Sequence, residues 1–177
     1  MLNYLSVSHG STCTEGPQQF PAVQIDAGQG NVVMTDSNNY AYFLIGSQWY
    51  KMGSLTLKHV SVGPAGIWGV DLNNRVYKYV AGSFVFANGE LYHRLNTVDG
   101  WIQVDGLAVM VEIGTDGSVF VVTRGGEVFQ RQGIDSSTPQ GTSWTQIPMT
   151  SRISHVSYDC GNLWVVTDYG TILKCLY

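Results

Sequence analysis

Charge is scarce in this 177-residue sequence. Asp, Glu, Lys and Arg make up only 12% of it, with nine basic and thirteen acidic residues. Disordered chains have the opposite composition, many charges and few aromatic residues, so we expect a folded domain. Nucleic-acid binding needs clustered Lys and Arg. Because Lys51, Lys58, Lys78 and Lys174 lie far apart in the sequence, we expect no nucleic-acid partner.

Long apolar runs and cysteines are also few. No apolar run approaches the roughly 20 residues that a membrane-spanning helix needs, so we expect no membrane insertion. The first residues, MLNYLSVSHGSTC, lack the charged and then apolar pattern of a signal peptide, which favours a cytosolic chain or a processed one. The three cysteines, Cys13, Cys160 and Cys175, leave at least one thiol unpaired within the chain and do not have zinc-site spacing.

What the sequence does contain is a repeat. Residues 26–44, 61–79 and 157–175 align with one another without gaps, and residues 112–131 align with one extra residue in the first turn. A unit this short cannot bury its apolar face alone and must stack on copies of itself. The repeat therefore constrains the fold class before any motif is considered.

Each repeat contains the signals of four short strands. Alternation of apolar and polar residues, as in 57–62, is typical of a half-buried strand, and a glycine-rich turn follows it. A dense apolar run comes next, then a turn of Asn, Asp and Gly, a third strand, and a fourth strand that begins on an aromatic residue. With no helix signal, this pattern predicts an all-β fold, a β-propeller of four-stranded antiparallel blades. A sandwich or β-helix would not explain a gapless repeat of this length.

The repeats divide a single domain, residues 1–177. Full units are expected over residues 23–53, 57–89, 107–147 and 152–175. The fourth strand of the second unit is expected at 84–89. A partial unit, 90–106, follows it, because ELYHR and WIQVDG match the last two strands of a unit, and residues 2–7 resemble a lone first strand. Such a chain either closes as a smaller ring with a loose hairpin or pairs its edges with another copy, as a homodimer.

The stretch LKHVSVGPAGIWGVDLNNRVYKY (57–79) resembles the tectonin repeat, and the half from EIGTDGSVF to TILKC is similar to fish egg lectins, relatives of the horseshoe-crab tachylectin-1-type lectin. The resemblance covers most of residues 13–177. It implies a secreted, non-enzymatic lectin that binds bacterial lipopolysaccharide and N-acetylglucosamine-type sugars in egg protection or innate defence. Members of this family carry more blades than the repeats found in this chain.

The resemblance also implies a disulfide. In the family, a cysteine near the amino terminus pairs with one in the last strand, and Cys13 and Cys175 hold those places. A segment around Cys13 that forms the outer strand of the last blade would lie beside 172–175 and close the ring. Cys160 falls in a turn and would be the odd thiol.

The sequence contains no recognisable catalytic constellation. GxSxG elbows and phosphate-binding loops are absent, and no local pair of carboxylates suits acid–base hydrolysis. His59 and His155 share one repeat position and are interpreted as strand residues. We therefore expect no enzyme activity and no cofactor. A structural calcium ion stays open, although no acidic loop has the spacing of a calcium site.

Sugar binding needs polar groups and an aromatic face, which propeller loops can supply on a rigid base. The turns between second and third strands should emerge on one face of the ring together with the blade-to-blade connections. The candidate carbohydrate-binding residues are Asp36, Asn38, Asn39, Asp71, Asn73, Asn74, Arg124, Asp168 and Tyr169. Hairpin formation alone would also explain Asn and Asp at these positions. The alternative function is a protein-interaction propeller that uses the same face.

The five tryptophans fall into two groups. Trp68 and Trp164 lie in second strands and are expected in the core. The other three, Trp49, Trp101 and Trp144, begin predicted outer strands, where packing between blades is expected rather than stacking on a ligand.

Overall fold

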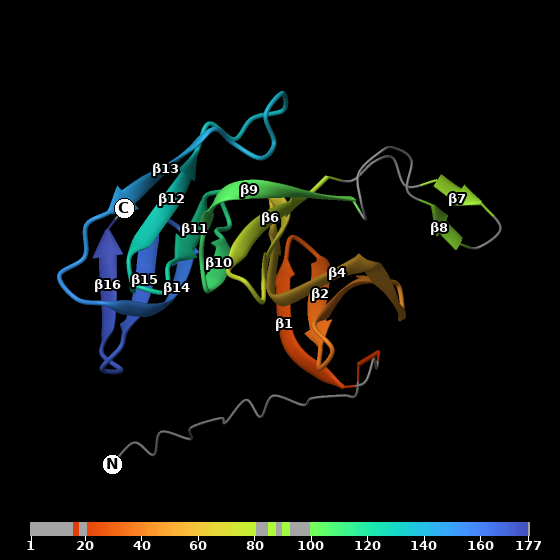
Figure 1. The fold of residues 1–177 in the computed structure, drawn as a ribbon, viewed down its shortest axis with the longest axis horizontal. Coiled ribbons are helices and arrows are strands. Elements are labelled where there is room, and N and C mark those ends of the chain that lie inside the picture. Colours follow the sequence, from red (N-terminus) through yellow and green to blue (C-terminus); the bar gives the residue numbers. More distant parts are fainter. Residues whose placement is uncertain (1–15, 18–20, 81–84, 88–89, 93–99, 177) are drawn as a thin grey trace, which may run out of the picture.

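The computed structural model describes residues 16–17, 21–80, 85–87, 90–92 and 100–176, and this part of the chain is built from strands and turns without a helix. Four curled antiparallel units follow one another along an arc (Figure 1). The strands are β1 (Ala22–Gly28), β2 (Asn31–Asp36), β3 (Tyr40–Ile45), β4 (Gln48–Gly63), β5 (Gly66–Asp71), β6 (Arg75–Tyr79), β7 (Val85–Ala87), β8 (Glu90–Tyr92), β9 (Trp101–Leu107), β10 (Met110–Ile113), β11 (Val119–Val122), β12 (Val128–Gln132), β13 (Ser143–Ile147), β14 (Ile153–Asp159), β15 (Asn162–Thr167) and β16 (Ile172–Leu176). The predicted all-β propeller architecture is confirmed.

The first two blades share a strand. Strand β4 is 16 residues long, and its first part is the outer strand of blade 1 while its second part is the inner strand of blade 2. Blades 1 and 2 therefore form one seven-stranded sheet in the order β1-β2-β3-β4-β5-β6-β9. Blade 3 is β10–β13, and the described part of blade 4 is the three-stranded sheet β14–β16.

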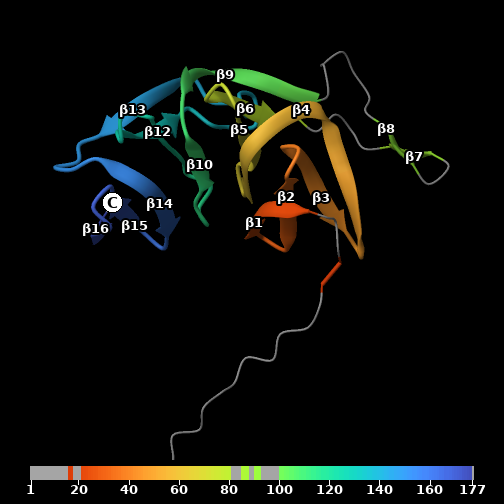
Figure 2. The same ribbon diagram turned by 60° about the horizontal axis from the view of Figure 1, so that its bottom comes forward.

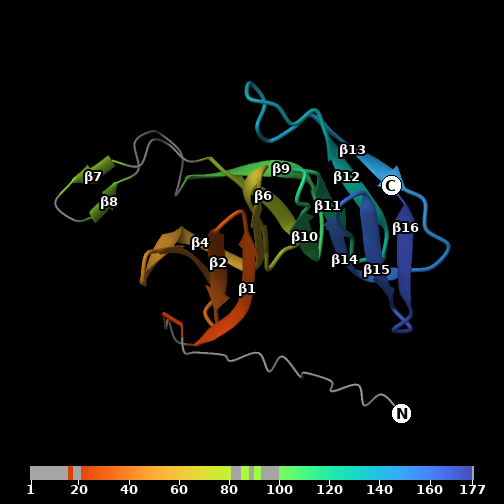
Figure 3. The same cartoon turned by 180° about the vertical axis from the view of Figure 1, so that it is seen from behind.

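The outer strand of blade 2 differs from the one expected at 84–89. Strand β6 pairs with β9, with Lys78 opposite Ile102, and β7 pairs only with β8 within the described residues. Figure 3 shows this hairpin standing away from the blades. WIQVDG is thus part of the outer strand of blade 2 and not the last strand of a partial unit at 90–106. The two segments have similar local patterns, and Trp101 decides between them because it buries its ring against Tyr79.

Neighbouring blades pack through one repeated apolar position. Val33, Trp68 and Phe120 hold this position in the second strands of blades 1 to 3, and each is fully buried. Each lies in a cluster with an inner-strand residue of the next blade, and those residues are Val60, Val111 and Val156. Trp68 is therefore core, as expected. Trp164 is not, because its side chain is 43% exposed at the same position of the last blade.

Tryptophans of the outer strands join one blade to the next. The indole N–H of Trp101 donates to the carbonyl of Met52, and that of Trp144 donates to the carbonyl of Asp105, at 3.0 and 2.7 Å. Both acceptors precede a positive-φ glycine at the end of the preceding outer strand. The predicted role of these two residues in packing between blades is confirmed.

Inner-strand side chains join the blades around the centre. The Asp26 carboxylate accepts from the Val62 amide at 2.6 Å, and the Ser61 hydroxyl accepts from the Ile113 amide at 3.1 Å. Glu112 holds the equivalent position in blade 3 and accepts from the Ser157 hydroxyl at 2.9 Å. Each inner strand is therefore tied to the next one through a side chain at the same repeat position.

The closing strand predicted near residue 13 and the lone strand at 2–7 lie outside the described residues. Figure 2 shows β1 and the sheet β14–β16 at the two ends of the arc. Among the described thiols, Cys160 is exposed and Cys175 half-buried, and both are free. Because Cys13 is outside the described part, the disulfide stays a prediction.

Candidate functional site

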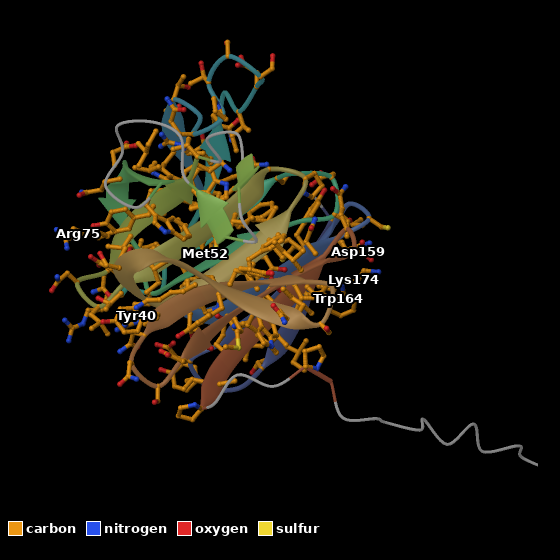
Figure 4. The ribbon with its side chains drawn as sticks, turned by 90° about the vertical axis from the view of Figure 1, so that its right-hand side faces the viewer. Tyr40, Met52, Arg75, Asp159, Trp164 and Lys174 are labelled. Carbon is orange, nitrogen blue, oxygen red and sulfur yellow. The ribbon has the colours of Figure 1, made fainter. Side chains whose placement is uncertain are left out.

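The turns between second and third strands emerge on one face of the ring, which we call the turn face (residues 36–40, 71–75, 123–127 and 167–171). Figure 4 shows Tyr40 and Arg75 from this face on the opposite side of the molecule from Asp159, the last residue of the inner strand β14. This agrees with the expected arrangement. The strand order places the turns that contain all nine candidate residues on this side of the blades.

The turns of blades 1 and 2 use their aspartates internally. Asp71 is 3% exposed, and its Oδ1 accepts from the amides of Asn73 and Arg75. Its Oδ2 accepts from the Arg75 Nε and the Tyr77 hydroxyl. Burial, followed by the charge of Asp71, raises the pKa of Tyr77, so the phenol stays protonated as a donor.

Asp36 repeats this network in blade 1, accepting from the amides of Asn38 and Tyr40 and from the Tyr42 hydroxyl, and it is 4% exposed. Both carboxylates are therefore fully engaged in forming their turns. For Asp36 and Asp71 the geometry favours the hairpin explanation over contact with a ligand.

The asparagines of these turns divide into two kinds. Asn38 and Asn73 are exposed at the turn tips. Asn39 and Asn74 have φ values of 63° and 67°, a left-handed conformation that Asn tolerates. The carbonyl of Asn39 accepts from the amide of Leu57 at 2.6 Å, where the next blade begins. The Asn74 carbonyl does the same for blade 3, and its side chain accepts from Lys58.

A cavity opens on the turn face between blades 3 and 4. Its volume is about 290 Å³. The walls come from the turn before β12, from the end of β13 and from the connection to β14. The lining residues are Gly125, Gly126, Glu127, Gln146, Ile147, Met149, Thr150, Ser151 and Arg152. Ile147 and Met149 supply an apolar patch, while a carboxylate, a carboxamide and a guanidinium supply polar groups.

Arg152, which lines this cavity, connects the turn of blade 3 with the turn of blade 4. Its Nη2 donates to the carbonyl of Arg124 at 3.2 Å, and its Nε lies 3.1 Å from Oδ2 of Asp168. The structure thus brings two of the predicted residues together through a third that the sequence did not identify. Tyr169, which is 91% exposed, lies at the tip of the blade 4 turn.

The sequence did not identify four side chains that line the cavity: Glu127, Gln146, Met149 and Arg152. The three that follow β12 lie in or beside a blade connection of irregular length, where the repeat alignment gives no guidance. Glu127 has a signal that could have been used, since it directly follows the Gly125-Gly126 turn. Its carboxylate accepts from the Thr123 hydroxyl.

A substitution at Gly126 tests how closely the blade 3 turn packs against Arg152 at this cavity. Its φ is 82°, and an added Cβ would lie 2.7 Å from the Cβ of Arg152. Gly170 holds the same turn position in blade 4, with φ 81° and open space around it. We expect Gly170→Ala to cost about 1 kcal/mol of unfolding free energy and Gly126→Ala about 2 kcal/mol more. Equal losses in urea unfolding would contradict the close contact.

A second hollow lies on the opposite face, where the inner strands end and the turns to the second strands begin. It has a volume of about 290 Å³ and is lined by the inner strands of all four blades, including Asp26, Glu112 and Asp159. Burial raises the pKa of Glu112. No three His, Cys, Asp or Glu side chains in the described ranges are grouped as a metal site would need.

His59 is a half-buried residue of the inner-strand part of β4. Among the described residues, its Nδ1 is the buried side-chain atom that has no hydrogen-bond partner. Burial, with a smaller contribution from the nearby His155, lowers the pKa of His59 to about 4. The histidine is therefore neutral in the folded protein at pH 7.

The arrangement of curled antiparallel blades along an arc, with the turns after their second strands collected on one face, is that of a β-propeller. Solved propellers agree at the level of the fold. Human WBSCR16 superposes with a TM-score of 0.60 at 15% identity, covering 86% of this chain and 47% of that one. Prp20p of Saccharomyces cerevisiae gives 0.59 at 11% identity, covering 90% and 46%.

Sequence comparisons identify the family of this chain within the propeller fold. The Tectonin domain model matches residues 21–94 and 92–168, so the chain belongs to the tectonin family. It is 37% identical to the fish-egg lectin of Cyprinus carpio over 123 residues, which are 68% of this chain and 48% of the relative. It is 31% identical to the perivitellin-2 31 kDa subunit of Pomacea maculata over 84 residues, 47% of this chain and 26% of the relative. The chain thus spans about half the length, or less, of these relatives.

No helix in the described residues is long and apolar enough to cross a membrane.

Proposed function

We propose that the chain is a secreted carbohydrate-binding protein of the lectin type, which uses its turn face to hold N-acetylglucosamine-type sugars of bacterial surface glycans such as lipopolysaccharide. The cavity between blades 3 and 4 carries this proposal. An aliphatic and thioether patch suits the methyl group and C–H face of an N-acetyl sugar, and the polar groups around it suit hydroxyls. The relationship to a fish-egg lectin supports the proposal, and the role that we propose is egg protection or innate defence.

The binding mode that we propose is multivalent. The four turns of the turn face have related backbones, so weak sites can repeat around the ring and act together on a glycan-rich surface. No covalent step is involved. Asn74→Ala is therefore expected to weaken glycan binding only in part, and complete loss would contradict a multi-site lectin.

Glu127→Ala tests the cavity directly. Removing a carboxylate that can accept from sugar hydroxyls should weaken N-acetylglucosamine binding at this site by about tenfold. Asp116→Ala is the matched control, because Asp116 is an exposed turn carboxylate that bonds Ser118 on the opposite face. Calorimetric titration with the free sugar, followed by a glycan array that includes lipopolysaccharides, provides the measurement. Equal binding by wild type and the Glu127 variant would remove this cavity from the proposal.

A protein-binding propeller is the second candidate function. Leu72 is 57% exposed and Tyr169 is 91% exposed at turn tips, and apolar groups there suit a protein partner. A free-thiol count separates the two settings. A bridge between Cys13 and Cys175 leaves one thiol and indicates an oxidising compartment, whereas three free thiols favour an intracellular scaffold.

A further inference from the structure

The three contacts between consecutive blades use the same pair of faces. The forward face of a blade presents the second-strand position of Val33, Trp68 and Phe120, and the backward face of the next blade presents the inner-strand position of Val60, Val111 and Val156. In blades 1 to 3 every forward residue is 0% exposed, and in blades 2 to 4 every backward residue is 0% exposed. The forward and backward faces are therefore complementary, because the same two repeat positions pack together at every contact.

One face of each kind is uncovered among the described residues. Trp164 holds the forward position of blade 4 and is 43% exposed, and Ile25 holds the backward position of blade 1 and is 66% exposed. The ammonium of Lys174 lies over the exposed Trp164 ring, as that of Lys78 lies over the buried Trp68 ring. Ile172, which is 68% exposed, corresponds to the buried Val76 and Val128 of blades 2 and 3. Figure 2 places the two uncovered faces at the two ends of the arc.

At the end of each inner strand, the size of the residue on the forward face complements the size of the residue that it meets on the backward face. An added Cβ at Gly63 would lie 2.6 Å from the Ile113 side chain, and one at Gly114 would lie 2.4 Å from Tyr158. A glycine on the forward side thus makes room for a large residue on the backward side. Blade 4 has Asp159 at the glycine position, and blade 1 has Ala27 at the position of Ile113 and Tyr158.

The existing contact between blades 1 and 2 shows where a contact between blades 4 and 1 would have to differ from it. An added Cβ at Gly28 would meet the backbone carbonyl of Val62, 2.1 Å away, and the Asp159 side chain would meet the corresponding carbonyl. A contact between blades 4 and 1 must therefore be slightly wider at its channel end. Ser157 holds the position of Asp26 and Ser61 and has a hydroxyl that can accept from the Ala27 amide.

We propose that the forward face of blade 4 binds the backward face of blade 1 of a second copy of this chain, and that two copies close head-to-tail into one ring with two such seams. The seam continues the contact that already joins the blades within the chain. Two copies also match the solved propellers in size, since one copy covers 47% of human WBSCR16 and 46% of Prp20p. A head-to-tail contact forms a closed ring when the rotation between copies allows it. This inference does not depend on sugar binding.

Two charge substitutions and their mixture test the seam. Trp164→Glu and Ile25→Glu each bury a carboxylate without a partner, and each is expected to raise the dimer dissociation constant at least about tenfold. Both positions are exposed in the single chain, so folding should persist. Controls are Tyr169→Glu and Leu72→Glu, which alter exposed residues of the turn face. Native mass spectrometry and sedimentation velocity give the masses.

The mixture distinguishes a head-to-tail seam from other dimers. A mixed dimer of the Trp164 and Ile25 variants has one seam with two altered faces and one seam with two native faces. We therefore expect the mixture to form more dimer than either variant alone. A contact of blade 4 with blade 4 would show no such recovery. A wild type that is monomeric at all concentrations, or a dimer that neither variant weakens, would overturn the proposal.

Discussion

Replacing Asp71 by alanine is expected to lower the free energy of unfolding by about 3 kcal/mol. The substitution leaves the Arg75 amide and the Tyr77 hydroxyl without their acceptor, and Tyr77 is only 7% exposed. An unsatisfied buried donor is costly because water cannot replace the lost acceptor. The Arg75 side chain is 43% exposed and can turn to solvent, so its loss should contribute little. Urea unfolding followed by tryptophan fluorescence gives the value.

Asp135→Ala is the matched control for this experiment. The Asp135 carboxylate accepts from Ser137 and from the Thr138 amide, but it lies on an exposed loop. Water can take over those bonds, so we expect a loss below about 1 kcal/mol. Losses of the same size in both variants would mean that burial of the Asp71 network does not stabilise the fold.

The second large effect is a loss of stability in mild acid that depends on His59. The folded-state pKa of His59 is about 4, against 6.5 for an unperturbed histidine. Between these values the unfolded chain takes up a proton that the folded protein refuses. The stability contributed by His59 is therefore complete above pH 6.5 and is lost as the pH falls to 4, by about 3 kcal/mol in total.

His59→Gln should flatten this dependence. Glutamine is suited to the site because Gln24 holds the same position in blade 1 and bonds the Val60 backbone. His155→Gln is the control, since His155 shares the repeat position but is exposed; losing its smaller contribution to the His59 pKa should change the slope only slightly. Unfolding free energies measured from pH 7 to pH 4 test the difference. If wild type and the His59 variant show the same slope, the histidine is not held neutral by burial.

The strands and turns within one repeat could be predicted from the sequence. Strands β2, β5, β11 and β15 coincide with the apolar runs, and the turn residues Asn39 and Asn74 have the left-handed conformation that their residue type suggests. These features depend on neighbouring residues in the chain. They follow from local preferences that the repeat presents four times.

Features that depend on contact between distant segments could not be predicted in the same way. Two segments after β6 begin on an aromatic residue, and only packing of Trp101 against Tyr79 selects β9 as the outer strand. The exposure of Trp164 depends on what lies against blade 4, which its own sequence does not state. Arg152 joins two turns from a connection without a repeat signature, so the cavity that it lines was missed.

Strand β4 has a consequence for how this chain can change in evolution. Its 16 residues pass from the rim of one blade to the channel side of the next without a loop. Gain or loss of a blade at that junction would cut a strand in mid-sheet, whereas the short connections after β9 and β13 can be cut and rejoined without breaking a ladder. A blade can thus be added or lost without cutting a strand only at junctions beyond the first pair of blades.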